Sequence, residues 1–133
     1  RKYGLKDKIK INATGKVATA FDIYKMLSLG ADLCCSARGM MISLGCIQAL
    51  ECDKNTCPTG VATQNEALMG GLVIEDKYRK VYNFHKNTIS SFLEIMAAAG
   101  ISDLDHFSRK LVFQRTNSYS SRSYAEIYPE DRK

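Results

Sequence analysis

No apolar run in this sequence approaches the roughly 20 residues that a membrane-spanning helix needs, and the N-terminus lacks the apolar core of a signal peptide. The lysines and arginines, which leave a net charge of +5, are spread among acidic residues without the dense basic stripe typical of nucleic-acid binding. The sequence therefore predicts no membrane segment and no nucleic-acid partner, and a cytoplasmic location is the default expectation.

The sequence also lacks a pair of carboxylates suited to acid–base catalysis and a nucleophile accompanied by a base. Its 133 residues suffice for one domain, and 45% hydrophobic with 25% charged residues is a globular composition. What it does have is five cysteines. In a reducing compartment such cysteines more often hold a metal or do chemistry than form disulfides, so their spacing is the main clue to function.

The first 30 residues predict a strand, a turn and a helix. Residues 9–13 alternate apolar and polar side chains as a short strand does. Residues 14–16, with sequence Thr-Gly-Lys, signal a turn, and the pair Thr19 and Asp22 forms a capping box for a helix that should end at Gly30.

The pattern then repeats. Residues 31–36 are expected to form a second buried strand, which leads through residues 37–39 into an apolar helix from Met40 to about Leu50. Alternation of this kind predicts an α/β fold with parallel strands. Because parallel sheets are buried on both faces and need several strands, the missing strands should come from elsewhere, and the start without an initiator Met fits a piece of something longer.

The second half is expected to be mainly helical. A polar connection containing Gly70 and Gly71 should run to about residue 80, before a helix near residues 87–99 that stops at Gly100. The apolar face of this helix comprises Ile89, Phe92, Leu93 and Met96. Two capping boxes that predict short helices are Ser102-x-x-Asp105 and Ser123-x-x-Glu126, with a Ser-rich loop at residues 116–122 between them.

The strongest chemical signal is Cys46-x5-Cys52-x4-Cys57, followed by Pro58. Thiolates are preferred ligands of iron–sulfur clusters, and a compact loop loses little chain entropy in wrapping one. Three close ligands suit a three-iron cluster. A four-iron cluster would need a fourth ligand, which Cys34 or Cys35 could supply if the fold brought it near.

The spacing alone leaves two other interpretations open. Zinc could be held by a Cys3His set that uses His85 or His106. Alternatively, Cys46 is a small core residue and the other two are ordinary buried thiols. A small regulatory or scaffold protein that binds a metal through these cysteines is accordingly the alternative functional class.

The turns at residues 14–16 and 37–39 form a second constellation. Small residues there should expose backbone N–H groups at helix N-termini, where an anion is favoured, and Lys16 or Arg38 would add positive charge. In (β/α)8 barrels the phosphate site is frequently built by the loops after strands 7 and 8. A glycine in such a turn can equally serve backbone geometry alone, so both interpretations stay open.

Three segments together resemble the FMN-binding synthase domain of glutamate synthases: IKINATGKVATAFDIYKMLSLGAD, SARGMMISLGCIQALECDKNTCPTGVATQ and VYNFHKNTISSFLEIMAAAG. The resemblance covers nearly the whole chain, and its cysteine block is the specific part. It implies a single partial domain over residues 1–133. Residues 1–50 would be the last two βα units of a TIM (β/α)8 barrel, residues 46–64 an iron–sulfur loop and residues 65–133 a helical extension.

The resemblance also implies two cofactors. A 3Fe–4S cluster would be ligated by Cys46, Cys52 and Cys57, and the phosphate of FMN would be lined by Gly15, Lys16, Ala37 and Arg38. In this family electrons pass through the cluster to FMN, which reduces the imine formed from 2-oxoglutarate and ammonia to give L-glutamate.

The resemblance implies no catalytic residue within this chain, because the strands facing the flavin ring, the 2-oxoglutarate site and the glutamine amidotransferase domain all lie outside it. The chain alone is therefore expected to be inactive. Its expected partners are the remainder of the barrel, in the same gene product or another chain, and an electron donor protein or subunit. Self-association into a homo-oligomer would be another way to cover open strand edges.

Overall fold

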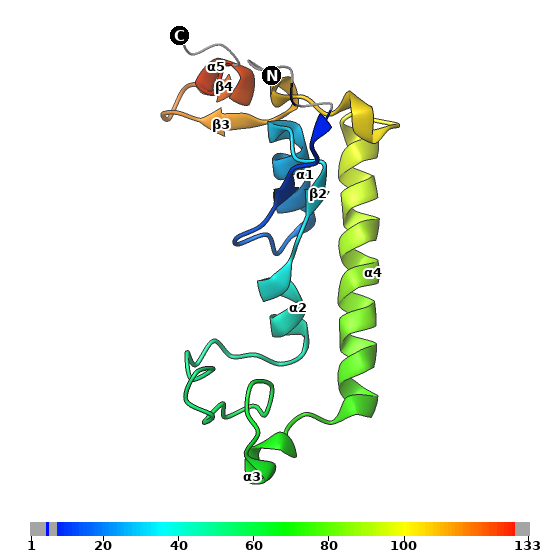
Figure 1. Ribbon diagram of the computed structural model, residues 1–133. Coiled ribbons are helices and arrows are strands. Elements are labelled where there is room, and N and C mark those ends of the chain that lie inside the picture. The colour runs from blue at the N-terminus through cyan, green and yellow to red at the C-terminus, as the bar shows by residue number, and fades with distance from the viewer. Residues whose placement is uncertain (1–4, 6–7, 130–133) are drawn as a thin grey trace.

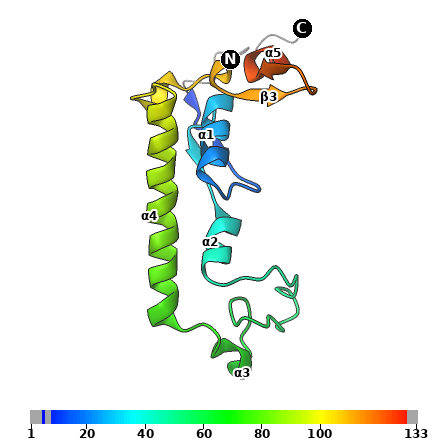
Figure 2. The same cartoon turned by 180° about the vertical axis from the view of Figure 1, so that it is seen from behind.

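The computed structural model describes residue 5 and residues 8–129. Its longest element is helix α4 (Ile74–Ala98), and the earlier elements lie along one side of this helix (Figure 1). The loop that carries the predicted cluster ligands lies near the start of α4, and the C-terminal elements lie near its end, as the reverse view also shows (Figure 2). The ends of the predicted domain at residues 1–4, 6–7 and 130–133 lie outside the described residues.

The first predicted unit is present. Strand β1 (Asn12–Ala13) leads to helix α1 (Ala20–Leu29), which returns the chain to strand β2 (Leu33–Cys34). The two strands pair in parallel, with Asn12 opposite Leu33. This confirms the predicted βαβ organisation, although each strand is shorter than predicted.

Local capping fixes both ends of α1 as the sequence predicted. The Thr19 side chain accepts a hydrogen bond from the backbone N–H of Asp22, and the Asp22 carboxylate accepts one from the backbone N–H of Thr19 at 3.0 Å. The helix ends at Gly30, whose φ of 106° is a left-handed conformation that glycine adopts at little cost. The box and its stop are therefore confirmed.

The second helix differs from the prediction. Helix α2 covers Ala37–Ser43, so it starts before Met40 and stops well short of Leu50. The chain leaves the helix at Gly45, which has a φ of 104°, and left-handed backbone recurs at Gln48 and Leu50. The predicted helix from Met40 to about Leu50 is therefore wrong at both ends.

The predicted polar connection up to residue 80 is also wrong. A short helix α3 (Glu66–Met69) begins after Asn65, whose side chain caps the backbone N–H of Ala67. Helix α4 then begins at Ile74, well before the predicted start near residue 87. The first half of α4 is polar and mostly exposed, so its sequence shows no periodic apolar face that would predict a helix.

The buried core lies where α1, α4 and the segment after α4 meet. Its members are Ala20, Tyr24, Phe92, Met96, Ile101 and Val112. The ring of Tyr24 meets that of Phe107 edge-on at 5.2 Å between centroids. Of the predicted apolar face of α4, Phe92 and Met96 are buried, whereas Leu93 is 56% exposed.

Beyond α4 come two 3₁₀ helices, Leu104–His106 and Arg109–Leu111, and an antiparallel pair, β3 (Phe113–Arg115) with β4 (Ser121–Ser123). Helix α5 (Tyr124–Ile127) closes the described chain.

Two predictions about these C-terminal elements need correction. Asp103, rather than Ser102, caps the first 3₁₀ helix, because its side chain accepts from the backbone N–H of Asp105 at 3.0 Å. The predicted loop at residues 116–122 includes the start of β4. The second predicted capping box, between Ser123 and Glu126, is confirmed.

The chain exposes an unusually large surface. Its accessible area is 9905 Å², whereas a compact monomer of this mass would expose about 7,000 Å². Apolar side chains of the strand region contribute, with Leu33 59% and Ile9 51% exposed. Within the described residues the strands form two separate two-stranded sheets, so no barrel is closed. No helix in that part of the chain is long and apolar enough to cross a membrane.

Candidate functional site

One cavity of about 380 Å³ gathers most of the residues singled out from the sequence. The turn after β1 and the turn after β2 form two of its walls, and the start of the cysteine loop forms the third. Its lining residues are Thr14, Gly15, Lys16, Val17, Cys35, Ala37, Arg38, Met41, Ile42, Cys46, Gln48, Leu50 and Cys52. The cavity thus contains all four predicted phosphate-site residues and two of the three predicted cluster ligands.

The turn after β1 has an unusual backbone. Gly15 has a φ of 88° and the next residue, Lys16, one of 59°. A Cβ atom added to Gly15 would meet no other atom within 4 Å, so the turn borders open space. The turn is anchored to the second wall because the Ser36 hydroxyl donates to the Val17 carbonyl at 2.7 Å, and Val17 is fully buried.

At the N-terminus of α1 a carboxylate of the chain takes up two backbone N–H donors. The Asp22 side chain accepts hydrogen bonds from the backbone N–H groups of Ala18 and Thr19 at 3.2 and 3.0 Å. Partial burial acts to raise the pKa of Asp22, but hydrogen bonds from Thr19, Ala18 and Lys25 outweigh it and lower the pKa to about 2. The side chains of Lys16 and Arg38, which line the cavity, carry positive charge.

The backbone of the cysteine loop is left-handed at three residues that are not glycine. Gln48 and Leu50, which line the cavity, and Asn55 have φ values of 58° to 60°, a region that residues other than glycine seldom occupy. Asn55 also tethers the loop, since its side-chain oxygen accepts from the Thr63 hydroxyl at 3.0 Å and from the Gln64 backbone N–H at 2.6 Å. Strained backbone of this kind clusters at functional sites, which supports a binding role for the loop.

A second tether closes the loop between the cysteines. The Glu51 carboxylate, adjacent to Cys52, accepts from the Thr56 hydroxyl at 2.8 Å and pairs with Lys54 at 3.2 Å. These contacts join the residues before Cys52 to those before Cys57. The closed segment therefore contains Cys52, and Cys57 follows directly after it.

The five cysteines have different surroundings. Cys46 and Cys52 line the cavity, as does Cys35, whose sulfur accepts a hydrogen bond from the Asn12 side-chain amide at 3.1 Å. Cys34 lines a separate cavity of about 260 Å³, and burial, followed by the neighbouring Cys35, raises its pKa. Cys57 is buried and lies outside the lining of both cavities.

Cys57 sits in a nest of donors. Hydrogen bonds from the Thr59 hydroxyl and from the backbone N–H groups of Ala62, Thr59 and Val61 lower the pKa of Cys57 to about 7. The Thr59 oxygen lies 3.4 Å from the sulfur. These hydrogen bonds favour the thiolate form of Cys57, which is the form of cysteine that binds iron or zinc.

Comparison with known proteins gives the family. Residues 1–102 match the protein family described as "Conserved region in glutamate synthase". This chain belongs to the glutamate synthase family. The resemblance seen in the sequence is confirmed, and family membership favours an oxidoreductase over an unrelated metal-binding scaffold.

Individual relatives agree. The chain is 44% identical over 115 residues to the glutamate synthase large subunit-like protein YerD of Bacillus subtilis, covering 86% of this chain and 22% of that protein. It is 33% identical over 105 residues to the archaeal glutamate synthase (NADPH) of Methanocaldococcus jannaschii, covering 79% and 21% respectively. This member of the glutamate synthase family thus spans about a fifth of the length of these two relatives.

Cysteine thiolates are suitable ligands for an iron–sulfur cluster, but the structure does not bring three of these cysteines close enough together to hold one. All five are free thiols. Among the residues that the structure describes, no three His, Cys, Asp or Glu side chains lie close enough together to hold a metal ion. Neither His85 nor His106 therefore completes a zinc site with the cysteines as the chain stands. Cluster binding would require the loop to close further around its ligands.

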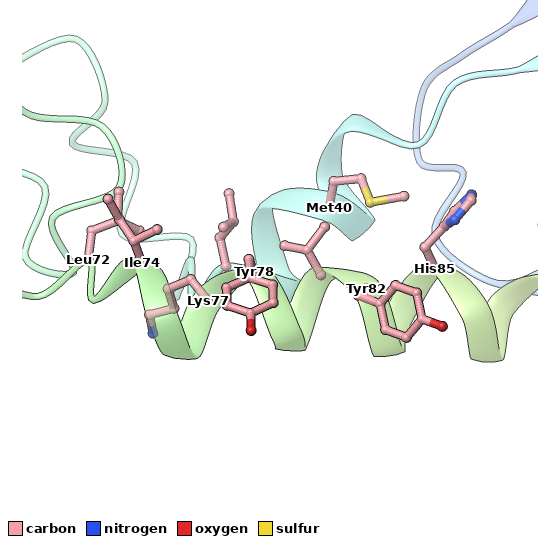
Figure 3. Close-up of a pocket in the computed structure, with 9 residues that line it drawn as sticks. Met40, Leu72, Ile74, Lys77, Tyr78, Tyr82 and His85 are labelled. Atoms are coloured by element: carbon pink, nitrogen blue, oxygen red, sulfur yellow. The ribbon is translucent and has the colours of Figure 1, made fainter.

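A second, larger cavity lies away from the candidate site. It has a volume of about 730 Å³ and lies between α2 and α4, where Met40 of α2 faces Tyr78 and Tyr82 of α4 (Figure 3). Its lining is mostly apolar, and Tyr82 is 63% exposed. It has no cysteine and no pair of Lys and Arg side chains, both of which line the smaller cavity. We therefore place the functional site in the smaller cavity.

Gly39 allows α2 to approach α4 closely. A Cβ atom at Gly39 would lie 2.5 Å from the Ser36 hydroxyl and 3.0 Å from the ring of Phe84. We expect Gly39→Ala to destabilise the protein by about 1–3 kcal/mol through overpacking. Gly70→Ala is the matched control, because nothing lies within 4 Å of the added atom. Thermal unfolding of the intact protein measures both, and equal melting temperatures would contradict the prediction.

Proposed function

We propose that this chain is the C-terminal part of a glutamate-synthase-type oxidoreductase that uses FMN and a 3Fe–4S cluster to form L-glutamate from 2-oxoglutarate and ammonia. The observation that carries the proposal is the shared cavity, lined by both strand-end turns and by two cysteines of the loop. Electron transfer requires the two cofactors to lie close together. Residues suited to the FMN phosphate and residues suited to the cluster line the same cavity. Membership of the glutamate synthase family supports the same assignment.

The proposed FMN phosphate site uses two kinds of residue. Lys16 and Arg38 line the cavity from two different turns, and both have side chains that would donate hydrogen bonds to phosphate oxygens. Gly15 and Ala37 leave room, since neither carries a side chain larger than a methyl group. When bound, FMN would supply the redox chemistry, while these residues hold its phosphate end in place.

The proposed cluster ligands are Cys46, Cys52 and Cys57. Two of them line the cavity, and the third is prepared as a thiolate by its donor nest. The Glu51 and Asn55 tethers hold the connecting chain in a compact loop, which lowers the entropy cost of bringing three ligands together.

The remainder of the catalytic machinery must come from outside these residues. The large exposed area and the open strand pair support residues 1–50 as the last two βα units of a TIM (β/α)8 barrel. The other strands, in the same polypeptide or another chain, would cover the exposed apolar surface, including the cavity between α2 and α4. The proposal further includes an electron donor protein or subunit, a cytoplasmic location and no activity of this chain alone.

Analysis of the intact protein, purified without oxygen, tests the proposal. We expect iron and acid-labile sulfide at about three and four atoms per chain respectively, as a three-iron cluster requires, together with bound FMN. Visible absorption and electron paramagnetic resonance would identify the cluster. A protein that holds zinc in place of iron, or that lacks flavin, would overturn the proposal.

A further inference from the structure

The turn at residues 14–16 is held at both of its ends by the segment that leaves β2. Before the turn, the Ala13 carbonyl accepts a hydrogen bond from the backbone N–H of Cys35 at 2.8 Å. After the turn, the Val17 carbonyl accepts one from the Ser36 hydroxyl at 2.7 Å. The first bond uses the backbone alone, so any residue but proline could make it, whereas the second depends on the side chain of Ser36.

The Ser36 hydroxyl serves this contact and not the helix that it precedes. Ser36 is the N-cap residue of α2, a position where serine usually accepts a hydrogen bond from the helix backbone. Among the described residues its side chain makes no cap hydrogen bond to α2. The hydroxyl is also closely packed, since a Cβ atom at Gly39 would lie 2.5 Å from its oxygen. Replacing Ser36 therefore tests the contact with Val17 and removes no cap from α2.

Both partners of this contact lie close in sequence to a cation of the candidate site. Val17 is buried and directly follows Lys16, and Ser36 comes two residues before Arg38. Lys16 and Arg38 are both exposed and line the cavity from different turns. One phosphate group can contact both cations only if the two turns keep a fixed spacing, and the Ser36 hydrogen bond joins one turn to the other.

Resting on the proposed FMN site, we propose that Ser36 is a positioning residue for the phosphate group, because its hydrogen bond to Val17 holds the turn of Lys16 beside the turn of Arg38. Two cations that are already in place spare the ligand the entropy cost of ordering both turns when the phosphate binds. Ser36 thus acts on the phosphate end of the flavin alone. Its contribution should favour FMN over riboflavin, which carries the same ring system without the phosphate group.

Fluorescence titration of the intact, flavin-free protein with FMN and with riboflavin tests this role. The decisive quantity is the ratio of the two dissociation constants, because a general loss of structure would weaken the binding of both ligands alike. We expect Ser36→Ala to weaken FMN binding about three- to tenfold, the effect of one lost hydrogen bond, and to leave riboflavin binding unchanged. Ser36→Thr keeps the donor and should keep the wild-type ratio.

Ser43→Ala is the matched control. The Ser43 hydroxyl also donates at 2.7 Å, but to the Met40 carbonyl within α2, and Ser43 lies outside the lining of the cavity. We expect this variant to keep the wild-type ratio. If Ser36→Ala is too unstable to purify, Ser36→Cys keeps the shape of the side chain with a weaker donor and should shift the ratio in the same direction.

The outcomes separate this inference from the proposed function. If the wild-type protein binds FMN no more tightly than riboflavin, the proposed phosphate site fails and the role of Ser36 fails with it. If the wild-type protein prefers FMN and Ser36→Ala keeps that preference, the positioning role alone is overturned. Equal weakening of both flavins in Ser36→Ala would also overturn it, since Ser36 would then support the fold in general.

Discussion

Replacing Cys52 with serine should remove the iron–sulfur cluster from the intact protein, whereas replacing Cys34 should leave the cluster in place. Cys52 lines the candidate cavity and is held in the loop closed by Glu51. Serine is a poor substitute because its hydroxyl resists deprotonation and lacks the softness of a thiolate. With only three close ligands, losing one should reduce bound iron nearly to background.

Cys34→Ser is the matched control, because Cys34 faces a different cavity. Iron and sulfide analysis, with the visible spectrum, measures both variants. Cys35→Ser is the more searching comparison, since Cys35 shares the cavity with Cys46 and Cys52. We expect its cluster to remain. Loss of iron in Cys35→Ser would point to a fourth ligand, and full iron in Cys52→Ser would refute the assigned ligand set.

Local chemistry explains which parts of the fold could be predicted from the sequence. The boxes at Thr19 and Ser123 involve residues three apart, so their hydrogen bonds depend on little beyond the helix itself. The stop at Gly30 is equally local. The parallel pairing of β1 with β2 followed from the alternation of strand and helix.

Helices α2 and α4 were harder to predict, because tertiary contacts decide where they begin and end. Residues 40–50 are apolar, yet the chain leaves α2 after Ser43 to build the cavity wall. Residues 74–86 carry many charges, yet they form the first half of α4. This half packs mainly against α2, across a wide apolar cavity, so it has no continuous buried face for a periodicity search to detect.

The candidate site was predictable in composition and not in arrangement. The cysteine spacing and the two turns identified seven residues, and the structure places six of them on one cavity. The presence of Cys35 in that lining depends on the end of β2 meeting the start of the loop, which no local pattern encodes. The capping box at Thr19 and Asp22 predicted that the Asp22 carboxylate would accept from backbone N–H groups at the start of α1, and it does so from Ala18 and Thr19.

Replacing Gly15 with aspartate should weaken FMN binding by the intact protein about ten- to a hundredfold, equivalent to about 1.4–2.7 kcal/mol. Gly15 lies in the turn after β1, and an added side chain there meets open space on the cavity wall. A carboxylate at this position would oppose the phosphate and would offset the positive charge of Lys16 and Arg38. Fluorescence titration of the flavin-free protein measures the dissociation constant.

Gly100→Asp is the matched control for backbone strain. Gly100 also has a positive φ, of 70°, and also has nothing within 4 Å of an added Cβ atom, but it follows α4 and lies far along the chain from the cavity residues. Both variants therefore pay a similar conformational cost, so a difference in FMN affinity reports the charge at the cavity. Equal affinities in the two variants would place the phosphate elsewhere. A smaller difference in FMN affinity between the two variants at high salt would support the electrostatic explanation, because salt screens the added carboxylate.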